Sequence, residues 1–191
     1  MNDLMRYAAD LEGVAGRRLP PVEKWNPEYC GELDLTIRAD GTWIYQGTPI
    51  GRARLVRLFS TVLRREGERY FLVTPVEKLK ITVEDAPFTA VLMREEGDGE
   101  DSKLVFTTNV GDEVAAGLDH ALSWRNRPGG GAPYLHVRAG LDALLSRSVM
   151  FDLVSFGERR LVGETEKFGV TSGRVYFPLA NVADIFSDAS I

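Results

Sequence analysis

The chain has 191 residues, of which 44% are hydrophobic and 27% are charged, and its formal net charge is -5. This composition is ordinary for a globular protein with one well-packed core or two small ones. A negative net charge argues against non-specific nucleic-acid binding, because that binding depends on neutralising phosphates with lysine and arginine. No apolar run approaches the roughly 20 residues that a membrane helix needs. We therefore expect neither a nucleic acid nor a membrane as a partner.

The N-terminal residues and the cysteine content both favour a cytoplasmic location. The first ten residues contain two acidic side chains and no apolar segment of the kind found in secretory signals. The single cysteine, Cys30, excludes an intramolecular disulfide and fits a reducing compartment.

The chain begins with an expected arm over residues 1–22, which includes a short helix over residues 1–16. Residues 33–38 then alternate between apolar and polar side chains, which is typical of a half-buried strand. Asp40-Gly41 is a turn signal, and residues 43–46 are aromatic and β-branched. These features predict a β-hairpin.

An amphipathic helix is predicted directly after the hairpin. Thr48 is a candidate N-cap, and Pro49 fits the first helical position because its missing N–H costs nothing there. Arg64 and Arg65 suit the negative end of the helix dipole, and Gly67 suits a C-terminal cap. The apolar face recurs at three- and four-residue spacing and comprises Leu55, Val56, Phe59, Val62 and Leu63.

The middle of the chain reads as a series of short strands. Residues 70–73, 79–83, 89–94 and 104–108 are each apolar or alternating. The acidic segment 95–102 joins the last two strands as an exposed loop. Consecutive short strands favour an antiparallel, twisted sheet over a doubly wound one.

The last part of the chain contains a second strand-helix unit. Residues 109–127 give no clear assignment. Residues 133–137 predict a strand, and the spacing of leucine and valine predicts a helix over residues 139–156, followed by short strands. This order repeats that of the strand at residues 43–46 and the helix after it, which suggests a duplicated β-α-β motif; coincidence is the alternative.

The predicted fold is therefore of the α+β class, with short, mostly antiparallel twisted sheets and two amphipathic helices. We expect the arm to be followed by a first α/β repeat with a β-meander over residues 23–110. A second α/β repeat is expected over residues 111–191.

The densest polar stretch supplies the candidate ligand-binding residues Glu77, Lys78, Glu84 and Asp85. They lie at the two ends of one short strand. Glu77 and Glu84 are separated by roughly 23 Å along an extended strand, so they cannot meet within it. Each end would line a separate polar site; the alternative is that these residues make turn and strand-edge hydrogen bonds.

No recognisable catalytic signature is present. His120 and His136 lack a third ligand at a metal-binding spacing, and the glycines at 129–131 are not followed by the Lys-Ser/Thr of a phosphate loop. We predict no catalytic residue, no metal and no cofactor.

Several segments stand out together: from Trp25 to Phe88 they read WNPEYCGELDLTI, DGTWIYQGTPI, LVRLFSTVLR, YFLVTPVEK and ITVEDAPF, with TNVGDEV and YLHVRAGLDALL further on. As a set they resemble an uncharacterised proteobacterial family, domain of unknown function 1285. The resemblance covers about residues 19–179. It implies a bacterial, cytoplasmic protein with a repeated α/β arrangement and a binding or signalling role, and no established activity.

These observations leave three hypotheses. The first is a non-enzymatic module, in signal transduction, that binds a small molecule or a protein partner in a groove between the two halves. The second is a homo-oligomeric structural or interaction protein. The third is a small-molecule hydrolase that uses carboxylates with Lys78 or His136.

Overall fold

The computed structural model describes residues 19–127 and 130–182. The helix predicted over residues 1–16 lies outside this part of the chain. The chain divides into two compact units, Met1–Pro87 and Phe88–Ile191, and each is described by itself. The predicted boundary after residue 110 falls inside the second unit. Sequence reasoning placed the strand at residues 104–108 with the preceding meander, whereas this strand pairs within the second sheet.

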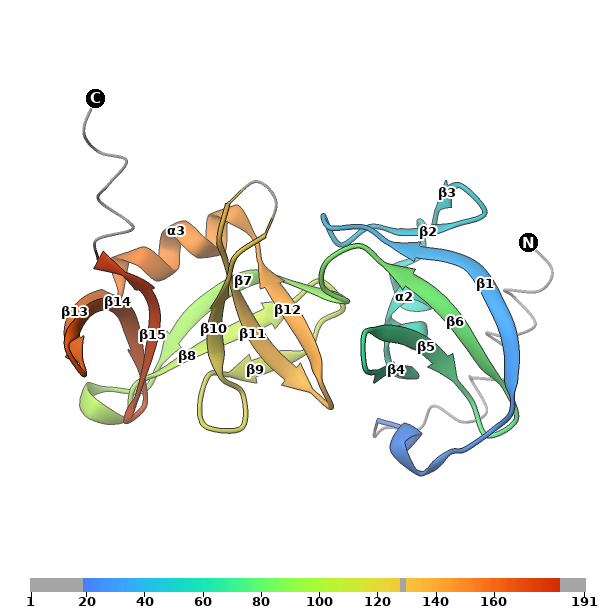
Figure 1. Ribbon diagram of the computed structural model, residues 1–191, viewed down its shortest axis with the longest axis horizontal. Helices are drawn as coiled ribbons and strands as arrows, with labels where there is room; N and C mark the ends of the chain where they lie inside the picture. The colour runs from blue at the N-terminus through green and yellow to red at the C-terminus, as the bar shows by residue number, and fades with distance from the viewer. Residues whose placement is uncertain (1–18, 128–129, 183–191) are drawn as a thin grey trace. The chain divides into compact units, whose positions relative to one another are not determined.

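The first unit is built on a six-stranded sheet of order β3-β2-β1-β6-β5-β4. The long strand β1 pairs with β2 on one side and with β6 on the other. The β1–β6 pair is parallel and all the other pairs are antiparallel. Figure 1 shows β1 and β6 side by side at the centre of this sheet. Its elements are η1 (Val22–Lys24), β1 (Tyr29–Ile37), β2 (Trp43–Tyr45), β3 (Thr48–Pro49), α2 (Ala53–Ser60), β4 (Leu63–Glu66), β5 (Arg69–Val73) and β6 (Lys78–Val83).

The second unit contains a six-stranded sheet of order β10-β11-β12-β7-β8-β9 and a three-stranded sheet of order β13-β14-β15. Its elements are β7 (Phe88–Glu96), η2 (Gly99–Asp101), β8 (Lys103–Thr108), β9 (Glu113–Ala115), β10 (Leu122–Arg125), β11 (Ala132–Arg138), β12 (Leu141–Leu145), α3 (Arg147–Ser155), β13 (Gly157–Val162), β14 (Thr165–Ser172) and β15 (Val175–Asn181).

The two six-stranded sheets have the same topology. Read from its other edge, the second sheet has the order β9-β8-β7-β12-β11-β10, which matches β3-β2-β1-β6-β5-β4 strand for strand. In both six-stranded sheets, the first and last strands of the sheet in chain order are central and parallel. The predicted α+β class with twisted, mostly antiparallel sheets is confirmed, and the similarity of the halves fits a duplication. None of the helices in the described ranges has the length and apolar character needed to cross a bilayer.

Cross-strand partners align the two repeats residue by residue. Leu63 lies opposite Leu72 in the first sheet, and Leu122 lies opposite Leu135 in the second. Both β4–β5 and β10–β11 continue from this pair for three further residues. The strand β11 therefore corresponds to β5. Sequence reasoning had matched residues 133–137 with residues 43–46, which form β2.

The first predicted helix is shorter in the structure. α2 ends at Ser60, and Arg64 and Arg65 lie on strand β4 instead of in a last helical turn. Thr61 and Val62 are β-branched and end the helix, and the residues after them pair with β5. Gly67 has φ of +61° in the two-residue turn between Glu66 and Arg69, so it closes a hairpin and not a helix.

The second predicted helix, over residues 139–156, is also divided. Its first part is the buried strand β12, which pairs with β11 and β7, and only the second part is the helix α3. All five residues of β12 are buried, Asp142 included, which suits a central strand that is covered on both faces. Ser146 separates the two because its hydroxyl accepts the N–H of Val149 at 3.3 Å as an N-cap. The unassigned segment 109–127 contributes β9 and β10.

Leu72 provides a test of the packing in the first sheet because it is completely buried. Leu72→Ala should lower the free energy of unfolding by about 2–5 kcal/mol, since it removes buried methyl groups and leaves a cavity. Leu118→Ala is the matched control, because Leu118 is 84% exposed and should change stability by less than about 0.5 kcal/mol. Urea denaturation followed by circular dichroism measures both. Equal effects from the two variants would contradict the described burial.

Candidate functional site

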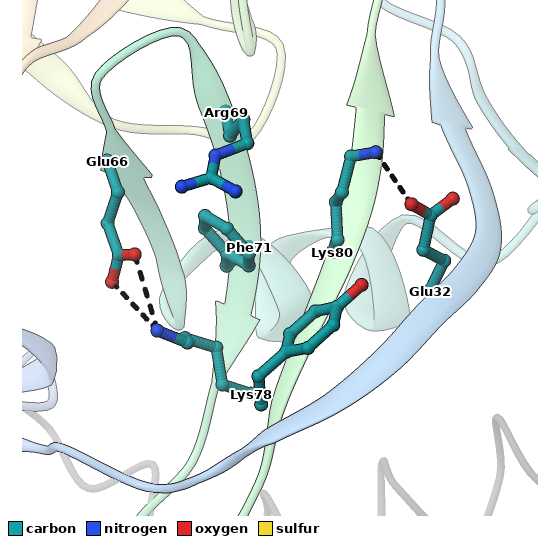
Figure 2. A pocket seen from close by; sticks show the side chains of 7 residues that line it. Glu32, Glu66, Arg69, Phe71, Lys78 and Lys80 are labelled. Atoms are coloured by element: carbon teal, nitrogen blue, oxygen red, sulfur yellow. Dashed lines mark hydrogen bonds and ion pairs between the residues drawn. The ribbon is translucent and has the colours of Figure 1, made fainter.

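A pocket of about 370 Å³ lies on one face of the first sheet. Figure 2 shows its side chains in front of β1, β4, β5 and β6, with the helix α2 behind the strands. Its lining is mostly charged and aromatic and comprises Tyr29, Glu32, Glu66, Arg69, Phe71, Lys78 and Lys80.

Strand alternation places these side chains together. Every second residue of a strand points to the same face, which brings Arg69 and Phe71 of β5 alongside Lys78 and Lys80 of β6. Lys80 is the direct partner of Phe71 on one side and of Glu32 on the other. A short hairpin and one parallel pairing therefore assemble the pocket from distant residues, such as Glu32 and Lys80, which are 48 positions apart.

The carboxylate of Glu66 joins two cations above the sheet. Its oxygens accept hydrogen bonds from the Arg64 guanidinium and from Lys78 Nζ, the latter at 3.3 and 3.4 Å. Burial by itself would raise the pKa of Glu66, but the hydrogen bonds from Arg64 and Lys78 outweigh it and lower the pKa below its ordinary value of 4.5. Arg64 also donates to the carbonyl oxygens of Val22 and Trp25, which ties the segment around η1 to β4.

Phe71 lies beneath two of the cations of the pocket, Arg69 and Lys78. Its ring is buried, and the Arg69 guanidinium and Lys78 Nζ lie 5.7 and 5.2 Å from its centroid. These distances are within the range of cation–π attraction. Lys80 Nζ donates to Glu32 at 2.7 Å. Within residues 19–127 and 130–182, Arg69 makes no ion pair with a carboxylate, so its charge is available to a ligand.

The second unit has an ion pair at the equivalent place, with the charges exchanged. By the alignment of the repeats, Glu66 and Lys78 correspond to Arg125 and Asp142. Arg125 donates to Asp142 at 2.6 Å, and its guanidinium lies 4.5 Å from the ring centroid of Tyr134, the counterpart of Phe71. A charged bridge over an aromatic ring is thus a shared structural device of both sheets.

The other charged residues of the pocket have uncharged counterparts in the second unit. Arg69, Lys80 and Glu32 correspond to Ala132, Leu144 and Thr89 respectively. The sheet therefore forms without charges at these three positions, and their presence in the first unit needs a reason other than the fold.

Of the four residues predicted as a binding site, the structure brings only Lys78 into the pocket. Glu77 and Thr74 form a turn in which the Glu77 N–H donates to the Thr74 hydroxyl at 2.9 Å. Glu84 lies beyond the far end of β6, roughly 20 Å from Lys78 along the strand. Its carboxylate accepts the N–H of Ala39 at 3.0 Å, while Asp85 follows it half-buried. The four residues do not converge.

The two histidines lie in the second unit. Nδ1 of His136 is 2.9 Å from a carboxylate oxygen of Asp142, its direct partner on β12. Nδ1 of His120 is 3.2 Å from the backbone oxygen of His136. The described residues contain no group of three or more His, Cys, Asp or Glu side chains that could hold a metal ion.

Sequence reasoning missed most of the pocket. Glu66 was assigned next to the end of a helix, and Arg69 was not singled out. Lys80 lies in the strand predicted over residues 79–83 and was not singled out. The available signal was the spacing of Lys78 and Lys80, which places two cations on one strand face. The parallel pairing of β1 with β6, which adds Tyr29 and Glu32, has no local signal.

Comparison with known families finds a match over both units. Residues 20–86 match "Domain of unknown function (DUF1285), N-terminal domain", and residues 87–179 match "Protein of unknown function (DUF1285), C-terminal domain". The change from one match to the next coincides within one residue with the division into compact units. No curated protein matches the chain.

Two crystal structures are similar to the chain. One is of a DUF1285 family protein from Silicibacter pomeroyi DSS-3, with 44% identity and a TM-score of 0.84, and it covers 93% of this chain and 96% of that one. The other is of a DUF1285 family protein from Shewanella baltica OS155, with 30% identity and a TM-score of 0.51 over 64% of this chain and 91% of that one.

Glu66→Gln tests the charged bridge. The folded-state pKa of Glu66 is lowered, so its stabilisation is complete above the ordinary value of 4.5 and is lost as the pH falls through the folded-state pKa. Glu66→Gln should lower the free energy of unfolding at pH 7 by about 1–3 kcal/mol, because hydrogen bonds to charged groups are lost. It should also make the decline in stability below pH 4.5 shallower.

The control is Glu68→Gln, because the Glu68 side chain is 93% exposed in its ion pair with Arg65. It should change stability by less than about 1 kcal/mol. Urea denaturation between pH 3 and pH 7 measures both variants. If the free energy of unfolding of Glu66→Gln depends on pH in the same way as that of the wild-type chain, the bridge does not stabilise the fold.

Proposed function

We propose that this chain, which belongs to the DUF1285 family, is a non-enzymatic module that binds a small anionic molecule in the pocket of its first unit. The observation that carries the proposal is the group of cations around Phe71 that the repeat does not require. Arg69 and Lys80 have the apolar counterparts Ala132 and Leu144.

Charge supports an anion as the ligand. Arg69 and Lys78 approach one buried ring, and Lys80 lies opposite it on β6, although cations on one face repel each other and lower the stability of a protein. Glu66 and Glu32 compensate Lys78 and Lys80, while Arg69 has no carboxylate partner in the described residues. An arginine fork is well suited to phosphate and carboxylate groups, because it donates two parallel hydrogen bonds.

Size also supports a small molecule. The pocket volume of about 370 Å³ lies at the lower end of the range of roughly 300–1,000 Å³ that is usual for ligand sites. The strands that carry the cations are paired on both sides, so the site is already formed before a ligand arrives. A rigid site reduces the entropy that binding costs.

The carboxylates of the pocket favour binding over catalysis. A general acid or base must exchange a proton with the substrate, and its pKa works best near the operating pH. Glu66 is held ionised by two cations, and Glu32 is paired with Lys80. The hydrolase alternative, the homo-oligomer alternative and the role in signal transduction stay predictions.

The test is isothermal titration of the full chain with inorganic phosphate and with citrate. The wild-type chain should bind at least one of them, and Arg69→Gln should weaken binding about tenfold, because one charge-assisted contact is lost. Raising the salt concentration should weaken binding further, since the attraction is screened.

The control is Arg57→Gln, which removes an exposed arginine from α2 outside the pocket. It has the same effect on net charge and should leave the affinity unchanged. Equal weakening by the two variants would indicate attraction to the overall charge of the protein, and absence of binding by the wild-type chain would refute the proposal.

A further inference from the structure

Tyr29 is the aromatic residue of the pocket that a ligand can reach. It is 54% exposed, whereas Phe71 is 2% exposed beneath Arg69 and Lys78. The two rings meet edge to face, with centroids 6.4 Å apart and planes at 90°. This contact fixes the orientation of Tyr29 and leaves more than half of its surface open. A fixed, exposed ring is a stacking platform for another planar group.

The charges that line the pocket fit an anion. Arg69, Lys78 and Lys80 face the carboxylates of Glu32 and Glu66, which leaves an excess of one positive charge. A phosphate monoester carries about 1.5 to 2 negative charges at pH 7. One phosphate group therefore suffices to compensate the charge that the pocket leaves unpaired.

Phe71 sets the distance between these two features. The ring centroid of Tyr29 lies 6.4 Å and the Arg69 guanidinium 5.7 Å from the ring centroid of Phe71, so the two groups are at most about 12 Å apart. Glu32 lies in the same pocket, opposite Lys80 of β6. The Glu32 side chain is 66% exposed, and a carboxylate is a common hydrogen-bond acceptor for the hydroxyls of a ribose.

From these three observations we propose that the ligand is a nucleoside monophosphate. Its base stacks on Tyr29, its phosphate accepts hydrogen bonds from Arg69 and Lys78, and its ribose hydroxyls donate to Glu32 in competition with Lys80. This inference rests on the proposed anion-binding function and adds an aromatic ring to the ligand. Stacking on a single exposed ring discriminates weakly between bases, because each base has a π-face.

The experiment is isothermal titration of the full chain with adenosine 5′-monophosphate, ribose 5-phosphate and adenosine as probes. The nucleotide should bind about tenfold more tightly than ribose 5-phosphate, because stacking adds to the phosphate contacts. Tyr29→Leu should abolish this difference and leave the affinity for ribose 5-phosphate unchanged. Tyr29→Phe, which keeps the ring, should retain the difference. Arg69→Gln should weaken both phosphates and leave adenosine unaffected.

The outcomes separate the two proposals. Equal affinity for the nucleotide and ribose 5-phosphate, both sensitive to Arg69→Gln, would overturn the aromatic ligand and keep the anion-binding function. A tighter nucleotide that Tyr29→Leu does not affect would also overturn the assignment of Tyr29. Binding of none of the phosphates would overturn both proposals. A thermal melt of Tyr29→Leu confirms that the variant is folded, which its exposure leads us to expect.

Discussion

The carboxylate of Glu66 accepts hydrogen bonds from cations on two strands and so spans β4, β5 and β6 over the buried ring of Phe71. The bridge connects the edge of the sheet to its centre. Through Arg64 it also holds the backbone of Val22 and Trp25. A cation over a buried ring loses part of its hydration, and a nearby carboxylate offsets that cost. Glu66 does so for Lys78, and the rest of the pocket depends on the geometry that results.

The second unit shows that this bridge belongs to the architecture. Arg125 and Asp142 occupy the places of Glu66 and Lys78, and Arg125 lies over Tyr134 as Lys78 lies over Phe71. The sign of each charge is exchanged while the pair and the ring persist. Because the attraction between two charges does not depend on which strand carries which sign, either arrangement stabilises the same sheet. Residues that differ between the repeats are therefore better guides to function than those that match.

The residues that differ between the two units have different roles in each. The first unit adds Arg69 and Lys80 around the ring, and the second unit instead places His136 at the position of Val73, where it contacts Asp142. In the first unit the added charges surround a pocket, and our proposals rest on that arrangement. In the second, the buried carboxylate of Asp142 uses both oxygens, one for Arg125 and one for His136. Such a carboxylate is satisfied within the sheet, and we assign it no ligand.

The sequence by itself determined the fold class, the existence of short strands and the position of α2 to within its ends. These follow from local rules: alternation of side chains, turn residues and apolar spacing. It also singled out Lys78. It suggested that the two halves are similar, but the strands that correspond were identified only by their pairing. It did not determine that Leu141–Leu145 form a strand, because a short segment rich in leucine fits a buried strand and a helix equally well until its partners β11 and β7 are known. Nor did it place Tyr29 and Glu32 beside Lys78 and Lys80, since a parallel pairing of the first and last strands of a unit joins residues with no local relation. The pocket exists only because that pairing closes, and this was decided by the tertiary structure.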